Sequence, residues 1–172
     1  MKCLKLSAIR SFAFPDVHRR CDGSGVTKWL ATEVELLTAS TNHQGHEKFY
    51  IVPVEVLPSL ASETHLKVAI LSFHFNSVFI RLDSQGMSHF DADGGGQVNC
   101  QFTAHSYEIF FLKQEKNGCY SFRSVQFPHC YIRLDGRGVH SSYASGGGTV
   151  NCQWYDASKP LGKYELFYVE EH

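Results

Sequence analysis

Apolar and polar residues alternate over short stretches of this chain, which is the pattern of half-buried β-strands. In the segment YIRLD, alternation places Ile132 and Leu134 on an inner face and Arg133 on the outer face. A helical period occurs only weakly, at 29–39. The strand-like segments are rich in β-branched and aromatic residues and are separated by turn residues. They include 67–73, 79–83, 97–102 and 107–112. The pattern therefore predicts an all-β protein.

One phrase of the sequence, which contains the letters VNCQ, occurs twice. GGGQVNCQF at 94–102 returns as GGGTVNCQW at 146–154, and the surrounding segments 75–102 and 127–154 align without a gap. A third, more divergent copy begins with FPDVHRRCDGSGV at 14–26, which matches FPHCYIRLDGRGV but lacks the triple glycine and the VNCQ phrase. Repeats of this length indicate units that are equivalent in structure.

The repeats predict how the chain is organised. We expect a single domain over 1–172, built from three repeats of four strands each at about 1–56, 65–116 and 117–172. Three such units in one domain favour a closed sheet with pseudo-threefold symmetry, because closure removes exposed strand edges. The role of 27–46, where the first unit departs from the pattern, stays open.

The order of these phrases resembles a known family. The succession of YIRLDG, GGGTVNC and KYELFYV in the last unit is similar to that of the fascin-like, actin-crosslinking β-trefoil proteins. The resemblance covers nearly the whole chain. It implies a β-trefoil fold of three pseudo-equivalent four-strand repeats, and it implies actin binding or crosslinking. Because one fold hosts many functions, the actin role follows from the resemblance alone.

The VNCQ phrase has a structural and a binding interpretation. In the structural one, its valines and cysteines face the core, so Cys100 and Cys152 are buried, reduced and inert. Alternation places Trp154 on this same inner face. The side-chain amides then satisfy backbone groups beside the glycine turns. In the binding interpretation the amides contact a ligand; they belong to Asn99, Gln101, Asn151 and Gln153. The triple glycines lead into a strand and no lysine follows them, so they predict tight turns with positive φ and not a phosphate loop.

An arginine stands two residues before an aspartate in all three units. We expect these side chains to point outward and to form local ion pairs that contribute little to stability. The pairs are Arg20–Asp22, Arg81–Asp83 and Arg133–Asp135.

The loops that precede the triple glycines are the predicted ligand surface. Segments 83–96 and 135–148 exceed the roughly 2–5 residues of a usual hairpin loop, and long loops on a rigid scaffold often carry function. The first unit lacks the phrase, which favours a role for these loops beyond closure of the fold. Aromatic rings supply apolar contact area, and carboxylates and imidazoles supply directional polar contacts. The predicted ligand-binding residues are His89, Phe90, Asp91, Asp93, His140 and Tyr143.

Composition and charge exclude several classes of function. The formal net charge is -1 without any basic block, which disfavours nucleic acid as a partner. No apolar run approaches the roughly 20 residues of a membrane span. The cysteines and histidines lack metal-ligand spacing and no catalytic constellation is visible, so we expect no metal, no cofactor and no enzymatic activity. The start of the chain does not resemble an export signal, which predicts a cytoplasmic protein with reduced thiols.

Three functions therefore stay open. The first is a non-catalytic actin-binding or actin-crosslinking module, as the resemblance implies. The alternative is a carbohydrate-binding trefoil lectin, because loops with aromatic residues and amides recur in two units, although Gln153 directly precedes Trp154 and the Gln-x-Trp signature of ricin-type trefoils is absent. The third is a leaderless cytokine-like protein. The expected partner is thus an actin filament or a glycan.

Overall fold

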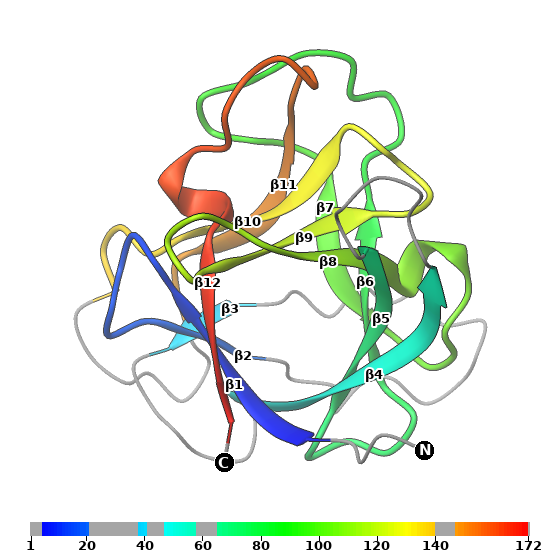
Figure 1. The fold of residues 1–172 in the computed structure, drawn as a ribbon. Coiled ribbons are helices and arrows are strands. Elements are labelled where there is room, and N and C mark those ends of the chain that lie inside the picture. The colour runs from blue at the N-terminus through cyan, green and yellow to red at the C-terminus, as the bar shows by residue number, and fades with distance from the viewer. Residues whose placement is uncertain (1–4, 21–37, 41–46, 58–64, 140–146, 172) are drawn as a thin grey trace.

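The computed structural model describes residues 5–20, 38–40, 47–57, 65–139 and 147–171, and these residues form an all-β fold (Figure 1). Helical turns in this part of the chain are limited to short 3-10 segments such as Ser106–Glu108 and Lys163–Glu165. The strands are β1 (Lys5–Ser11), β2 (His18–Arg20), β3 (Thr38–Ser40), β4 (Lys48–Leu57), β5 (His65–Ser72), β6 (Phe79–Asp83), β7 (Gln97–Gln101), β8 (Ile109–Gln114), β9 (Tyr120–Ser124), β10 (Cys130–Asp135), β11 (Thr149–Trp154) and β12 (Phe167–Glu171). The predicted all-β class is therefore confirmed.

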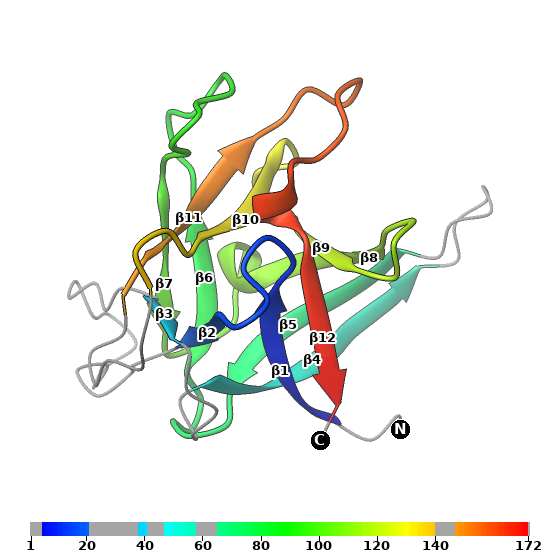
Figure 2. The same cartoon turned by 90° about the vertical axis from the view of Figure 1, so that its left-hand side faces the viewer.

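The strands pair antiparallel, and six of them close into a ring. Strand β1 pairs with β4 and β12, β5 pairs with β4 and β8, and β9 pairs with β8 and β12. The other strands form the hairpins β2–β3, β6–β7 and β10–β11, which join the ring through β1, β5 and β9. In both views the connections that follow β6 and β11 project from the same end of the molecule (Figures 1 and 2). The same pattern of four strands thus recurs three times.

The first strand of each unit ends in the same turn. The backbone N–H of Phe14 donates a hydrogen bond to the hydroxyl of Ser11 over 3.2 Å. A serine hydroxyl in this position stabilises a turn by accepting a bond from the backbone a few residues further on. The same bond joins Phe75 to Ser72 at 3.2 Å and Phe127 to Ser124 at 3.1 Å. The divergent first repeat therefore keeps the turn chemistry of the other two.

Strand β3 occupies the place of the VNCQ phrase in the first unit. Ala39 pairs with Arg19, as Cys100 pairs with Ile80 and Cys152 pairs with Ile132. The helix that the weak period indicates at 29–39 is therefore wrong at residues 38 and 39, which belong to a strand. Residues 29–37 lie outside the described part of the chain.

The core forms inside this closed arrangement, with side chains from all three units. Cys100 and Cys152 are buried within it and neither forms a disulfide, as predicted. The face opposite the core is not a solvent face, however, because Asn99 and Gln153 on that face are also buried. Trp154, which strand alternation assigns to the core, is only partly buried against it.

An arginine lies in the core of the first unit. By strand register, Arg19 takes the position of Ile80 and Ile132. Its side chain is fully buried, and its guanidinium nitrogens have no hydrogen-bond partner among the described residues. The guanidinium lies 4.2 Å from the ring centroid of Phe167, and burial lowers the pKa of Arg19 to about 9. The guanidinium also lies 5.6 Å from the ring centroid of Phe122. A buried cation without hydrogen bonds is costly, and these two cation–π contacts offset only part of that cost.

We expect Arg19→Ile to raise the free energy of unfolding by about 1–4 kcal/mol, because an apolar side chain then replaces a desolvated charge at a position where the other repeats carry isoleucine. Chemical denaturation monitored by circular dichroism measures the change. Arg19→Lys, which keeps a buried charge, is the matched control and should not stabilise. A less stable Arg19→Ile protein would contradict this interpretation of the core.

Candidate functional site

The second VNCQ phrase holds the loop between β6 and β7. The amide of Asn151 donates to the backbone carbonyl of Asp93 over 2.9 Å. The amide of Gln153 donates to the carbonyl of Asp91, whose backbone N–H in turn donates to the oxygen of Gln153 over 3.2 Å. A phrase of the third unit therefore satisfies backbone groups in a loop of the second unit.

The triple glycine allows this close approach. The backbones of Gly95 and Cys152 exchange two hydrogen bonds of 2.9 Å. Gly94 has φ +72°, and a Cβ there would lie 2.7 Å from the side-chain oxygen of Asn151. Gly96 has φ +60°, and its Cβ would lie 2.6 Å from the carbonyl oxygen of Asp83. Both the predicted positive φ and the tight contact thus require glycine.

Arg133 lies beneath the same loop. Its guanidinium donates to the carbonyl of Ala92 over 3.3 Å, to Asp135 over 3.1 Å and to the side-chain oxygen of Asn151 over 3.4 Å. The side chain is 1% exposed. The prediction that Arg133 points outward is therefore wrong, because the loop folds over the face that strand alternation assigns to solvent.

The predicted ion pairs exist in the two later units. Arg81 lies 2.9 Å from Asp83, and Arg133 lies 3.1 Å from Asp135. Arg137 adds a further contact to Asp135 at 2.6 Å. In the first unit, the side chain of Arg20 and all of Asp22 lie outside the described residues.

The predicted ligand-binding residues of the β6–β7 loop lie at its exposed tip. His89, Phe90, Asp91 and Asp93 are all exposed. The Phe90 ring meets the ring of Tyr155 edge-on with 5.6 Å between centroids, and Asp93 lies 3.4 Å from Arg137. The other two predicted residues, His140 and Tyr143, lie outside the described residues.

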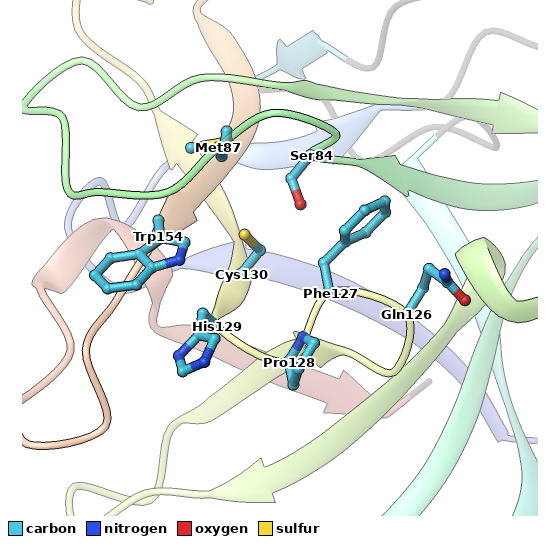
Figure 3. Close-up of a pocket in the computed structure, with 8 residues that line it drawn as sticks. All are labelled: Ser84, Met87, Gln126, Phe127, Pro128, His129, Cys130 and Trp154. Carbon is cyan, nitrogen blue, oxygen red and sulfur yellow. The ribbon is translucent and has the colours of Figure 1, made fainter.

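A hollow of about 170 Å³ lies at the base of this loop (Figure 3). Met87, Phe127 and Trp154 are partly buried and form its walls. Buried Ser84 and Cys130 form its floor, and the rim consists of the exposed side chains of Gln126, Pro128 and His129. Ser84 and Met87 belong to the second unit and the other lining residues to the third, so the hollow lies between these two units.

Polar groups without partners face this hollow. The Trp154 indole stacks on the His129 imidazole with 5.2 Å between centroids. The indole nitrogen lies on the side of the ring that faces the hollow (Figure 3). Within the described residues it makes no hydrogen bond. Nδ1 of His129 lies 3.2 Å from the carbonyl oxygen of Tyr155. This contact favours the tautomer with the proton on Nδ1, which leaves Nε2 as an acceptor.

The side chains in the floor of the hollow are chemically unreactive. Burial raises the pKa of the Cys130 thiol, so the thiol stays protonated at neutral pH and is a poor nucleophile. The hydroxyl of Ser84 lies beside this thiol and has no hydrogen bond of ordinary geometry among the described residues. The arrangement is suited to binding.

None of the four described loop-tip residues lines the hollow, so sequence reasoning missed its principal members. Strand alternation assigns Trp154 to the core. The available signal was its place at the last position of β11, where a strand leaves the core and a large aromatic ring can bridge core and solvent. His129, in the turn before β10, carried no signal in the sequence.

The described residues contain no group of three or more side chains that could hold a metal ion. Within the same part of the chain, no helix is long and apolar enough to cross a membrane.

Comparison with known proteins reveals similarity of fold. No family model matches the chain, and no curated protein matches it. A mosquitocidal holotoxin aligns with a TM-score of 0.62 and 9% identity over 100% of this chain and 18% of the toxin chain. The GlcNAcα1-4Gal-releasing endo-β-galactosidase of Clostridium perfringens aligns with a TM-score of 0.58 and 8% identity over 100% of this chain and 33% of the enzyme chain. The chain therefore spans a third or less of each of these proteins, and at such identity the likeness concerns the fold alone.

We expect the contribution of Asp135 to stability to disappear in acid. Hydrogen bonding from Arg137, followed by Arg133, lowers the pKa of Asp135 to about 2, against a usual value near 4. A depressed carboxyl pKa stabilises the folded state above pH ~4, and this stabilisation is lost as pH falls towards 2. Asp135→Asn should therefore cost roughly 2 kcal/mol at pH 7 and progressively less from pH ~4 to ~2.

Urea denaturation of both proteins across this pH range measures the difference. Arg137→Gln removes the solvent-facing partner of Asp135 and should cost less than Asp135→Asn, because Arg133 still donates to the carboxylate and the exposed Arg137 contact is screened by water. A cost of Asp135→Asn that stays constant from pH 7 to pH 2 would contradict the assignment.

Proposed function

We propose that this chain is a non-catalytic carbohydrate-binding protein, and that the hollow at Trp154 receives one sugar residue. The observation that carries the proposal is an indole that faces the hollow with a free N–H and stacks on a histidine whose Nε2 is left as an acceptor.

The chemistry of the hollow matches that of a sugar ring. A pyranose presents an apolar C–H face together with hydroxyl groups that both donate and accept hydrogen bonds. The walls at Trp154, Met87 and Phe127 supply apolar contact, and the indole N–H, the imidazole Nε2 and the amide of Gln126 supply directional partners. The volume of about 170 Å³ is below the ~300–1,000 Å³ of pockets for drug-sized ligands. The hollow is therefore sized for one ring of a glycan and not for a whole oligosaccharide.

The proposed fold is the β-trefoil that the sequence resemblance implies. A closed ring of six strands with three attached hairpins, repeated with the same turns in each unit, supports this assignment. Membership of the fascin-like family and a cytoplasmic location stay predictions from the sequence.

The structural relatives favour a sugar over a filament as the partner. One of them is named for the release of a disaccharide, GlcNAcα1-4Gal, and neither is named for actin binding. The protonated, buried thiol of Cys130 in the floor supports a binding role without catalysis, because a cysteine nucleophile requires the thiolate.

We expect Trp154→Ala to lower glycan affinity at least tenfold, because it removes both the stacking surface and the indole donor. Trp154→Phe keeps a ring without the donor and should give an intermediate loss. Glycan-array screening followed by calorimetry on the selected glycan measures the change, and thermal unfolding confirms that each variant folds.

Phe90→Ala is the matched control, since Phe90 is an exposed aromatic residue outside the hollow. Its affinity should equal that of the unmodified protein. If Phe90→Ala abolishes binding and Trp154→Ala does not, the site lies at the loop tip, as the sequence predicts. If the protein binds filamentous actin in co-sedimentation and no glycan, the proposed function is wrong.

A further inference from the structure

A second hollow, of about 290 Å³, borders the first. Pro128 and His129 line both hollows, so they form the ridge between them. The second hollow lies between the end of β8, strands β9 and β10, and the segment 155–161 that follows β11. A ligand seated on Trp154 can therefore extend over His129 into this space.

The second hollow differs from the first in its charge. Three cationic side chains line it, from Lys113, Arg123 and Lys159, together with the carboxylates of Glu115 and Asp156. In a chain of net charge -1, such a gathering of cations is a local feature.

Both carboxylates of this hollow are already engaged. Glu115 accepts a hydrogen bond from the hydroxyl of Ser121 over 2.7 Å and lies 3.6 Å from the ammonium of Lys113. Asp156 accepts bonds of 3.0 Å from both the backbone N–H and the hydroxyl of Ser158, as the cap of a turn. Glu115 therefore neutralises Lys113, and Asp156 caps a turn.

The other two cations lack a close acidic partner among the described residues, and Asp156 interacts with the charge of Lys159 only at longer range. Among the described residues, neither Arg123 nor Lys159 forms an ion pair. The guanidinium of Arg123 lies 4.8 Å from the ring centroid of Phe111 and donates to the carbonyl of Pro128 over 3.5 Å, which holds it in place. Lys159 is exposed and lines the hollow from the segment after β11.

Tyr131 adds a neutral hydrogen-bonding group. Its hydroxyl has no partner within the described residues, and burial raises the pKa of Tyr131, so the phenol remains a donor at neutral pH. The hydroxyl of Tyr155, in contrast, is used by Glu165 and by the backbone of Gly162 at 2.8 Å each, so Tyr155 contributes its ring alone.

We propose that the second hollow is a subsite for an anionic group, a carboxylate or a sulfate ester, on the sugar residue next to the one at Trp154. The ligand is then an acidic oligosaccharide: Trp154 and His129 hold one ring, Arg123 and Lys159 bind the anion, and Tyr131 donates to the same residue. This assignment depends on the proposed function, because the ligand reaches the second hollow across His129.

Matched glycans test the subsite. Calorimetry compares one neutral disaccharide with the same disaccharide carrying a uronic carboxylate and with the same disaccharide carrying a sulfate ester. We expect both acidic forms to bind about tenfold tighter than the neutral one, with an advantage that shrinks as salt rises. Whichever acidic form binds tighter identifies the source of the anion.

Variants of the second hollow should remove this preference selectively. Arg123→Gln and Lys159→Gln should each weaken binding of the acidic disaccharides about threefold to tenfold and leave the neutral one unchanged. Lys163→Gln, which makes the same change of charge outside both hollows, is the matched control and should bind like the unmodified protein.

The outcomes separate this inference from the proposed function. Equal affinity for neutral and acidic disaccharides, with both lost in Trp154→Ala, would leave the sugar site in place and overturn the anionic subsite. An acidic preference that survives both glutamine variants would also overturn it. Failure of the unmodified protein to bind any glycan would overturn the proposed function, and the subsite with it.

Discussion

The structure depends on the capture of one repeat's loop by the strand phrase of the next repeat. Amides of Asn151 and Gln153 and the guanidinium of Arg133 donate to three successive backbone carbonyls of the β6–β7 loop, those of Asp91, Ala92 and Asp93. The side chains of Arg133 and Gln153 are buried and must find partners, so the loop and strand β11 specify each other's position. The triple glycine of the second unit allows the two backbones to approach closely. The VNCQ phrase of the third unit thereby joins the two neighbouring units.

The candidate site is a consequence of this capture. Because the loop is held against β11, its first residues, Ser84 and Met87, are brought next to Trp154 at the end of that strand. The turn before β10 then supplies His129, which closes the hollow and separates it from its charged neighbour. Backbone hydrogen bonds between Gly95 and Cys152 and from Tyr155 to His129 hold the apolar walls and the unpaired donor in place, which favours recognition of a ligand with defined stereochemistry.

Much of the fold could be predicted from the sequence, because strand alternation and the internal repeat report directly on local pairing. The site could not, because alternation describes a strand and its immediate faces but not a loop that folds over them. Arg133 illustrates this limit, since its outward face is covered by the loop of another repeat. Trp154 illustrates it again: the pattern assigns it to the core, while its position at the end of β11 leaves it partly exposed. The cations of the second hollow come from separate strands and a loop, so no local motif unites them.

The Trp154 indole N–H resonance tests the central claim most directly. In a Trp29→Phe protein, Trp154 is the only tryptophan, so a two-dimensional ¹H–¹⁵N spectrum contains a single indole signal. Titration with a glycan that binds should shift this signal until it saturates, because the indole N–H then donates to a sugar hydroxyl. The titration curve should give the same dissociation constant as calorimetry. A glycan that binds while the indole signal stays unmoved would contradict the account.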